Sequence, residues 1–373
     1  MENNDKGIYC INVSNLFIGT CHIHHNNGPA LDGYNLLNVE VKNCLVHNNG
    51  QDLKDNGICT GGFEFGMANE IHSNLTVSDC VIHDNIGMGI NIMKGDKVSV
   101  NQNDIYRNSW RGVRFISVSN IIIHHNQIFE NGQVGIIGEG YIVSNIEIVN
   151  NTISKNGQGD EFYHGGIYLQ GCSPGVIIKN NNISLNNGTG VYPNGTPDVI
   201  IIGNDIIGNL WDGIYLPKFY DFFTIKNNNI KGNLNGISIT CNNTNVSGNI
   251  ISKNEIGIGL YYGSNNVIHG NEISNNNEGI HISTGATNNE VSCNNLMNND
   301  VQANFYYRFT DSLPLRRNNN FYNNYWNRLR LFPKPIFGKL RIRLTIFGND
   351  ISETIPWLNF DWHPAQEPYD IGG

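Results

Sequence analysis

The chain has little charge, little proline and no long apolar run. Of its 373 residues, 15% are charged and 11 are proline. No stretch of 18 apolar residues occurs, so the sequence predicts no membrane span. The net charge of −9 argues against a broad basic surface for nucleic acid, so nucleic acid is excluded as a partner. Because 39% of the residues are hydrophobic, the chain is not disordered by composition either.

Two further motifs are missing. The chain has eight cysteines but no C-x-x-C pair, which excludes zinc ribbons and thioredoxin-like redox sites. No signal peptide is recognisable, because the polar start at Met1–Asp5 leads directly into repeat material. We therefore expect either a cytoplasmic protein or a fragment that lacks its leader and its N-terminal cap.

Asparagine and glycine are the abundant residues, with 65 and 42 copies. A Gly-apolar-x-apolar motif recurs, mostly every 21 to 24 residues, and is followed by an alternating stretch and by Asn-x-apolar-x-x-Asn. The clear copies begin at Gly89, Gly112, Gly166, Gly213, Gly236 and Gly279, and weaker ones at Gly7, Gly33, Gly57, Gly135, Gly190 and Gly257.

Each repeat therefore contains three short strands separated by corners of glycine and asparagine, residues that tolerate left-handed backbone conformations. Three such strands cannot bury an apolar face alone, whereas stacked copies can. The sequence predicts an all-β fold, a single-stranded right-handed parallel β-helix of about 12–13 coils with three short strands per coil. We expect domain boundaries at 1–324 for the repeats and 325–373 for a Pro- and aromatic-rich tail that caps the last coil.

The paired asparagines predict two buried ladders, in which each side-chain amide hydrogen-bonds to the equivalent amide on the next coil. In the first three coils one ladder changes to Cys21, Cys44 and Cys80, which we expect to be free buried thiols. The first ladder comprises Asn103, Asn126, Asn151, Asn181, Asn204, Asn228, Asn249, Asn271 and Asn294. The second comprises Asn26, Asn49, Asn85, Asn108, Asn131, Asn156, Asn186, Asn209, Asn233, Asn254, Asn276 and Asn299.

Over about residues 7–324 these repeats resemble the right-handed parallel β-helix proteins of the pectin lyase-like superfamily. Within it they are most similar to the NosD-like group with CASH-type PbH1 repeats. The resemblance implies an extracytoplasmic setting, either secreted, periplasmic or at the cell surface. It does not imply one reaction, because this fold carries lyases, hydrolases, epimerases and adhesins.

The side chain at the x position of each Gly-apolar-x-apolar strand should point to solvent. We expect these side chains to form a ligand-binding face. Tyr168, Tyr192 and Tyr215 would stack on consecutive coils, as suits sugar rings, although tyrosine is also simply a good strand former. A long insertion at 157–165 would form one wall and Trp211 a rim. The other expected ligand-binding residues are Arg114, Glu139, Asp160, Glu161, Gln170 and Asn194.

Two functions stay open at this level. The first is a non-catalytic, monomeric surface protein that binds a polysaccharide, a cell-surface glycan or another partner. The second is a lyase or epimerase of uronate-containing glycans, in which Tyr168 or His164 is the base and Arg114 neutralises the uronate. Because Arg114 lies two coils from Tyr168, the separation favours binding. Hydrolysis is disfavoured, since outward carboxylates on the glycine strands are few.

A second outward row consists of His24, His47 and His83, followed by Tyr106 and Phe129. Stacked imidazoles can bind copper, and NosD-like proteins are often described as copper-binding. We expect an aromatic stack without metal, because no carboxylate or thiolate completes a ligand set. Calcium is the other metal considered, but the clustered aspartates of pectate lyases are not recognisable, so no cofactor is expected.

Overall fold

The computed structural model contains β-strands and no helix in the residues that it describes. These residues are 1–51, 60–66, 72–140, 144–157, 165–310, 319–346 and 349–371. The chain divides into two compact units, residues 1–200 with 204–211 and residues 201–203 with 212–373. The division falls within β21 (Val199–Ile202).

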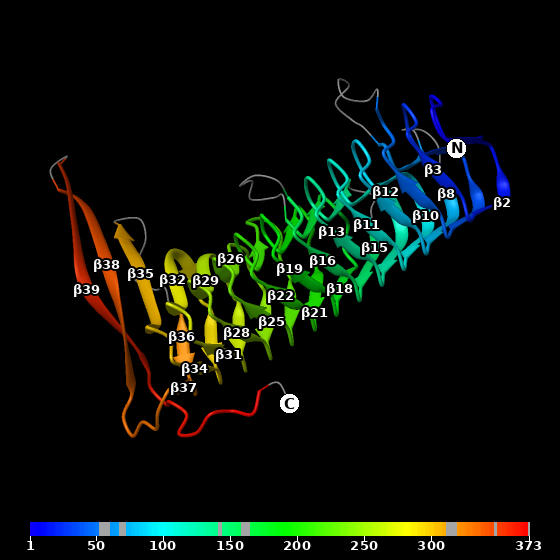
Figure 1. Cartoon of the computed structure of the whole chain (residues 1–373). Helices are drawn as coiled ribbons and strands as arrows, with labels where there is room; N and C mark the ends of the chain where they lie inside the picture. The colour runs from blue at the N-terminus through cyan, green and yellow to red at the C-terminus, as the bar shows by residue number, and fades with distance from the viewer. Residues whose placement is uncertain are drawn as a thin grey trace. The chain divides into compact units, whose positions relative to one another are not determined.

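In the first unit the strands pair in parallel, coil upon coil, in a long sheet and a short sheet (Figure 1). The long sheet contains β1 (Ile8–Ile11), β2 (Ser14–Gly19), β4 (Leu31–Tyr34), β5 (Leu37–Lys42), β7 (Phe63–Phe65), β8 (His72–Ser78), β10 (Ile90–Asn101), β12 (Val113–His124), β14 (Ile136–Glu139), β15 (Ser144–Val149), β17 (Ile167–Gln170), β18 (Val176–Lys179) and β20 (Val191–Asn194). The short sheet contains β3 (His22–His24), β6 (Leu45–His47), β9 (Val81–His83), β11 (Asp104–Tyr106), β13 (Gln127–Phe129), β16 (Thr152–Ser154), β19 (Asn182–Ser184) and β22 (Asp205–Ile207).

The second unit repeats this arrangement and adds an antiparallel hairpin, β38 (Lys334–Ile346) with β39 (Asn349–Asp361). Its other long-sheet strands are β23 (Ile214–Leu216), β24 (Thr224–Lys226), β26 (Asn235–Ile239), β27 (Asn245–Ser247), β29 (Ile256–Ser264), β30 (Val267–His269), β32 (Glu278–Thr287), β33 (Glu290–Ser292), β35 (Val301–Thr310) and β36 (Asn320–Tyr322). The short-sheet strands are β25 (Asn229–Lys231), β28 (Ile250–Ser252), β31 (Glu272–Ser274), β34 (Asn295–Met297) and β37 (Tyr325–Trp326). The predicted all-β parallel β-helix of about 12–13 coils is confirmed.

Both predicted asparagine ladders are present in each unit. In the first ladder the Asn103 amide donates to Asn126 Oδ1 at 3.0 Å, and the Asn126 amide donates to Asn151 Oδ1 at 2.9 Å. The remaining predicted members pair in the same way within their unit. A third ladder, which sequence analysis missed, joins Asn289 to Asn319 at 2.8 Å in the second unit.

The glycine that begins each strand is required for a close approach rather than for a left-handed backbone. A Cβ at Gly112 would meet Ile128 Cγ2 at 2.5 Å and Gly135 O at 2.6 Å. The residues directly before the ladder positions are left-handed, and they include asparagine and glycine, as at Asn180 and Gly203, and bulky residues such as Arg107 and Leu185. The predicted left-handed backbone of glycine and asparagine at the corners is thus observed, although other residue types adopt it too.

The early coils have a different register from the predicted one. The outward residue of β4 is Asp32, with Ala30 in the place of the initiating glycine, so the repeat does not begin at Gly33. The next strand is β7, preceded by Gly62 rather than Gly57, which lies outside the described residues.

The seven cysteines among the described residues are free, as expected. Cys44 and Cys80 are buried, and Cys21 is half-buried. Burial raises the pKa of the Cys172 and Cys241 thiols to about 12 each. The Cys172 and Cys241 thiols thus behave as small apolar side chains in the core.

Asp361 ends the first ladder in the second unit. Its Oδ2 accepts hydrogen bonds from the Asn324 backbone N–H at 3.0 Å and from the buried Trp326 Nε1 at 2.9 Å. A carboxylate therefore takes the place of the next amide oxygen. The domain boundary at residue 324 stays a prediction.

Candidate functional site

The candidate site lies on the outward face of β12, β14, β17 and β20 in the first unit. Parallel register places Arg114 beside Ile137, Ile137 beside Tyr168, and Tyr168 beside Tyr192. Two residues further along the strands, Glu139, Gln170 and Asn194 form a second outward row. Period-2 alternation accounts for both rows, because the intervening side chains point into the core.

Glu139 lies between two arginines. Its Oε2 atom is 2.5 Å from Arg114 Nε and 3.5 Å from Arg111 Nη1. All three side chains are largely covered, with exposed fractions of 12% for Arg114, 21% for Glu139 and 23% for Arg111. The cluster has one more positive charge than negative, which suits an anionic ligand group.

Tyr168 and Tyr192 form the aromatic part of the site. The ring centroids of Tyr168 and Tyr192 are 5.2 Å apart, with the planes inclined at 35°. The Asn194 side chain donates a hydrogen bond to the Tyr168 hydroxyl at 3.0 Å. The rings are thereby fixed as neighbours on consecutive coils, although they are not parallel.

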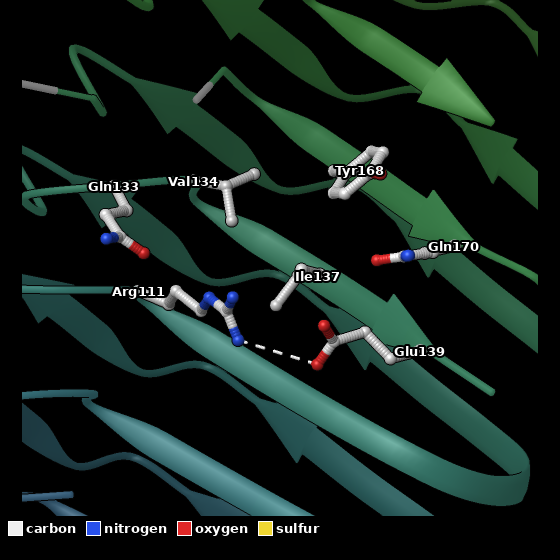
Figure 2. Close-up of a pocket in the computed structure, with 7 residues that line it drawn as sticks. All are labelled: Arg111, Gln133, Val134, Ile137, Glu139, Tyr168 and Gln170. Atoms are coloured by element: carbon white, nitrogen blue, oxygen red, sulfur yellow. Dashed lines mark hydrogen bonds and ion pairs between the residues drawn. The ribbon is translucent and has the colours of Figure 1, made fainter. Parts of the chain in front are cut away.

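A hollow of about 240 Å³ lies beside these residues (Figure 2). In Figure 2 Arg111 and Glu139 point toward one another across the hollow, with Tyr168 and Gln170 on the adjoining strand. A neighbouring hollow of about 320 Å³ shares Glu139 and Gln170 and also contacts Arg114. The lining of the first hollow comprises Arg111, Gln133, Val134, Ile137, Glu139, Tyr168 and Gln170.

Arg111 is the functional residue that sequence analysis missed. Burial lowers the pKa of its guanidinium, the Glu139 carboxylate opposes that effect, and Arg114 adds to it. Its Nε is buried and has no hydrogen-bond partner among the described residues. A buried donor of this kind costs free energy unless a ligand or water meets it. Its only sequence signal was its place directly before Gly112 in Trp-Arg-Gly.

Outward carboxylates are more frequent than the sequence indicated, because the register of the early coils was misassigned. Asp32 and Glu64 are neighbours in the same outward row, followed by Asn91. Lys6 forms an ion pair with Asp32, and the Asn91 amide donates to Glu64 Oε1 at 3.0 Å. Burial raises the pKa of Glu64. Because Asp32 is buried and already paired, this group forms a structural network rather than an open carboxylate pair for hydrolysis.

Tyr215 and Trp211, two other predicted site residues, are not among the residues that line this hollow. Tyr215 lies on β23 in the second unit, where its register partner is Ser238, a residue that is only 1% exposed despite its outward position. Trp211 is half-buried, donates its backbone N–H to Gly188 O at 3.4 Å and does not line the hollow. Asp160, Glu161 and His164 lie outside the described residues.

The predicted second row is a continuous stack of rings on the short sheet. The His24 and His47 rings are 5.2 Å apart, His47 and His83 5.1 Å, and His83 and Tyr106 4.8 Å, with interplanar angles of 17° or less. Phe129 continues the stack at 4.7 Å from Tyr106.

Within the stack of His24, His47 and His83 the rings present their faces to one another, while nitrogen atoms approach only in pairs, as His22 Nε2 and His47 Nε2 do at 2.8 Å. In the described part of the chain no three His, Cys, Asp or Glu side chains are placed to hold one ion. The described residues therefore do not fit a copper or calcium centre.

Two family models match the chain. One is described as a right handed beta helix region and matches residues 66–206, and the other as a periplasmic copper-binding protein (NosD) and matches residues 161–330. No curated protein matches the chain. None of the described residues forms a helix long and apolar enough to cross a membrane.

Three solved structures are similar to this chain at low identity. The A-module of a mannuronan C-5 epimerase from Azotobacter vinelandii is 17% identical, with a TM-score of 0.49 over 77% of this chain and 76% of that one. An alginate lyase from Paenibacillus sp. is 14% identical, with a TM-score of 0.44 over 68% and 95%. A DFA-IIIase from Arthrobacter chlorophenolicus is 12% identical, with a TM-score of 0.46 over 71% and 66%.

The repeats, the parallel coils and the family matches agree with one another. The right-handed parallel β-helix that the repeats predict is thereby confirmed, and part of the chain is similar to the NosD family.

Proposed function

We propose that the chain is an extracytoplasmic, monomeric β-helix protein that binds a polysaccharide with acidic groups at the hollow of Arg111, Glu139 and Tyr168. The observation that carries the proposal is the buried Arg111 Nε, which has no hydrogen-bond partner among the described residues and lies at a hollow with an aromatic ring. A carboxylate on a sugar would supply that partner, while the ring would contact the apolar face of the sugar. The periplasmic description of the matching family model supports the extracytoplasmic setting.

The outward rows define how a sugar chain would lie. Tyr168 and Tyr192 are on consecutive coils, so two successive sugar units would each contact one ring. Gln170 and Asn194 are two residues further along the same strands and offer amides to the hydroxyl groups. We expect modest affinity, since each aromatic contact adds about 1 kcal/mol.

Isothermal titration of the intact protein with oligogalacturonates, and with neutral oligosaccharides of equal length, tests this proposal. Arg111→Gln should weaken binding of the acidic series about tenfold or more, because hydrogen bonds to charged groups contribute about 1.5–3 kcal/mol. Arg107→Gln is the matched control, since Arg107 is an exposed arginine that pairs with Asp84 instead. Unchanged affinity in Arg111→Gln, or no binding of either series, would refute the proposal.

The alternative is a lyase or epimerase of uronate-containing glycans, and one observation favours it. Arg111 lines the same hollow as Tyr168, whereas Ile137 separates Arg114 from Tyr168 in the row. Arg111 rather than Arg114 would then neutralise the uronate while a base removes the C5 proton. A lyase would break the C4–O bond and leave an unsaturated sugar that absorbs ultraviolet light, and an epimerase would return the proton to the opposite face. Accumulation of either product, abolished by Tyr168→Phe, would establish catalysis over binding alone.

A further inference from the structure

The loop between β37 and β38 in the second unit exposes large apolar side chains. Leu329 is 59% exposed, Leu331 81% and Phe332 80%. Single exposed leucines are ordinary, but three within four residues form a local apolar patch that normally marks a contact surface.

Cations alternate with these apolar residues. Arg328, Arg330 and Lys334 flank them, and within the described residues none of the three forms an ion pair with a carboxylate. The region is exceptional in a chain of net charge −9, because residues 312–349 contain eight Lys and Arg and no Asp or Glu. The buried Arg330 Nε also has no hydrogen-bond partner among the described residues.

The three cations are close enough to affect one another. Burial lowers the pKa of Lys334, and Arg330 and Arg328 lower it further by repulsion. Burial also lowers the pKa of Arg330, and repulsion from Arg328 lowers it further. An anion bound at this loop would relieve the repulsion.

The loop is held by the chain that follows the hairpin. The Gln366 side chain donates to the Arg330 carbonyl at 2.6 Å, and the Ala365 N–H donates to Asn324 O at 3.0 Å. Figure 1 shows the loop in orange at the lower end of the hairpin and the red C-terminal segment running past it. Trp362 in that segment is 62% exposed. The loop is thus tied to the segment that follows the hairpin, and that segment also exposes an aromatic residue of the kind found at membrane interfaces.

We propose that this loop, residues 327–334, docks the protein on the surface of a membrane rich in anionic phospholipid. Leu331 and Phe332 would enter the boundary of the acyl chains, while Arg328, Arg330 and Lys334 would bind the lipid phosphates. A soluble polyanion would satisfy the cations but leave the apolar side chains in water. A symmetric contact with a second copy would place the same cations against one another.

Vesicle co-sedimentation of the full chain tests this docking. At low salt the protein should bind vesicles of phosphatidylcholine with about one third phosphatidylglycerol, and bind pure phosphatidylcholine vesicles weakly. Arg328→Gln/Arg330→Gln should lower the partition coefficient roughly 25-fold, since each cation near an anionic surface contributes about fivefold. Leu331→Ser/Phe332→Ser should lower it roughly tenfold. High salt should reduce binding of the intact protein.

The matched controls are Leu185→Ser and Arg107→Gln, two exposed changes in the first unit that should leave binding unchanged. Melting temperatures of all variants verify that folding is intact. The proposal fails if anionic vesicles do not bind the protein or if the loop variants bind as well as the intact chain. It also fails if oligogalacturonate binds the loop as tightly as vesicles do, or if light scattering detects a dimer that Leu331→Ser/Phe332→Ser dissociates.

Discussion

The inward and outward faces of the coils follow opposite rules. At the inward corner, successive coils carry the same residue, as in Asn103, Asn126 and Asn151. On the outward face of the glycine strands register neighbours can differ in charge, polarity and shape, as Arg114, Ile137 and Tyr168 do. An inward amide must bond to a copy of itself, whereas an outward side chain meets solvent or a ligand. Residues that recur from coil to coil therefore indicate the fold, and residues that differ between coils indicate where a functional site can lie.

The largest effect should come from breaking an inward ladder. Asn126→Leu removes the acceptor for the Asn103 backbone N–H and side-chain amide, which lie 3.0 Å away from it. With two buried donors left unpaired at about 1–3 kcal/mol each, the free energy of unfolding should fall by about 4 kcal/mol. Urea denaturation measures the loss.

The neighbouring exposed residue is the matched control for this change. Gln127→Leu introduces the same side chain one position later on the outward face, and it should alter stability by no more than about 0.5 kcal/mol. Equal losses in the two variants would contradict the distinction between the inward and outward faces.

A buried histidine should make the stability of the protein depend on pH. His72 on β8 is fully buried, its Nδ1 accepts the Leu36 N–H at 3.3 Å, and burial lowers its pKa to about 4. The unfolded chain therefore binds the proton more tightly than the folded protein between pH 6.5 and pH 4. Stability due to this group is present above pH 6.5 and is lost as the pH falls toward 4, by about 3 kcal/mol.

The measurement is the difference in unfolding free energy between the intact protein and His72→Gln across this pH range. Buried carboxyl groups act in the opposite direction, because burial raises the pKa of Asp212 to about 6. Subtracting the two curves removes that contribution, which both proteins share. A difference that does not vary with pH would show that His72 is not the group responsible.

The fold was predictable because the inward pattern is enforced by hydrogen bonding at every coil. The ladder numbering from Asn26 to Asn299 followed from spacing alone. The early coils were misassigned because Ala30, rather than a glycine, stands directly before β4. Gly33 was then taken as the start of a strand that in fact contains it.

The candidate site was predictable only where alternation within a strand applies. Arg114, Tyr168 and Tyr192 have the outward positions that period 2 assigns to them. Arg111 stands at a corner, where alternation does not decide which way a side chain points. Ser238 shows the other limit, because an outward strand position can still be covered by neighbouring side chains.

A smaller effect should follow from interrupting the outward ring stack. Tyr106→Ala removes ring contacts to His83 at 4.8 Å and Phe129 at 4.7 Å, and should lower the free energy of unfolding by about 1 kcal/mol. Tyr106→Phe keeps the ring and should be close to neutral. A loss in Tyr106→Ala as large as that of Asn126→Leu would mean that the outward face also determines the fold.

The smallest expected effect is a response of this stack to copper. His24 and His47 are stacked at 8°, so their nitrogens do not converge on one point. Burial lowers the pKa of His47, and the neighbouring histidines lower it further. Both effects favour the neutral imidazole, which is the form that binds metal. We nevertheless expect no stoichiometric binding of Cu²⁺ in calorimetric titration, because three converging donors are lacking in the described residues. Sub-micromolar binding that disappears in His24→Ala/His47→Ala/His83→Ala, with the melting temperature unchanged, would reverse this expectation. The repeated outward histidines would then bind metal. Residues that differ between coils would no longer be the ones that indicate function on this surface.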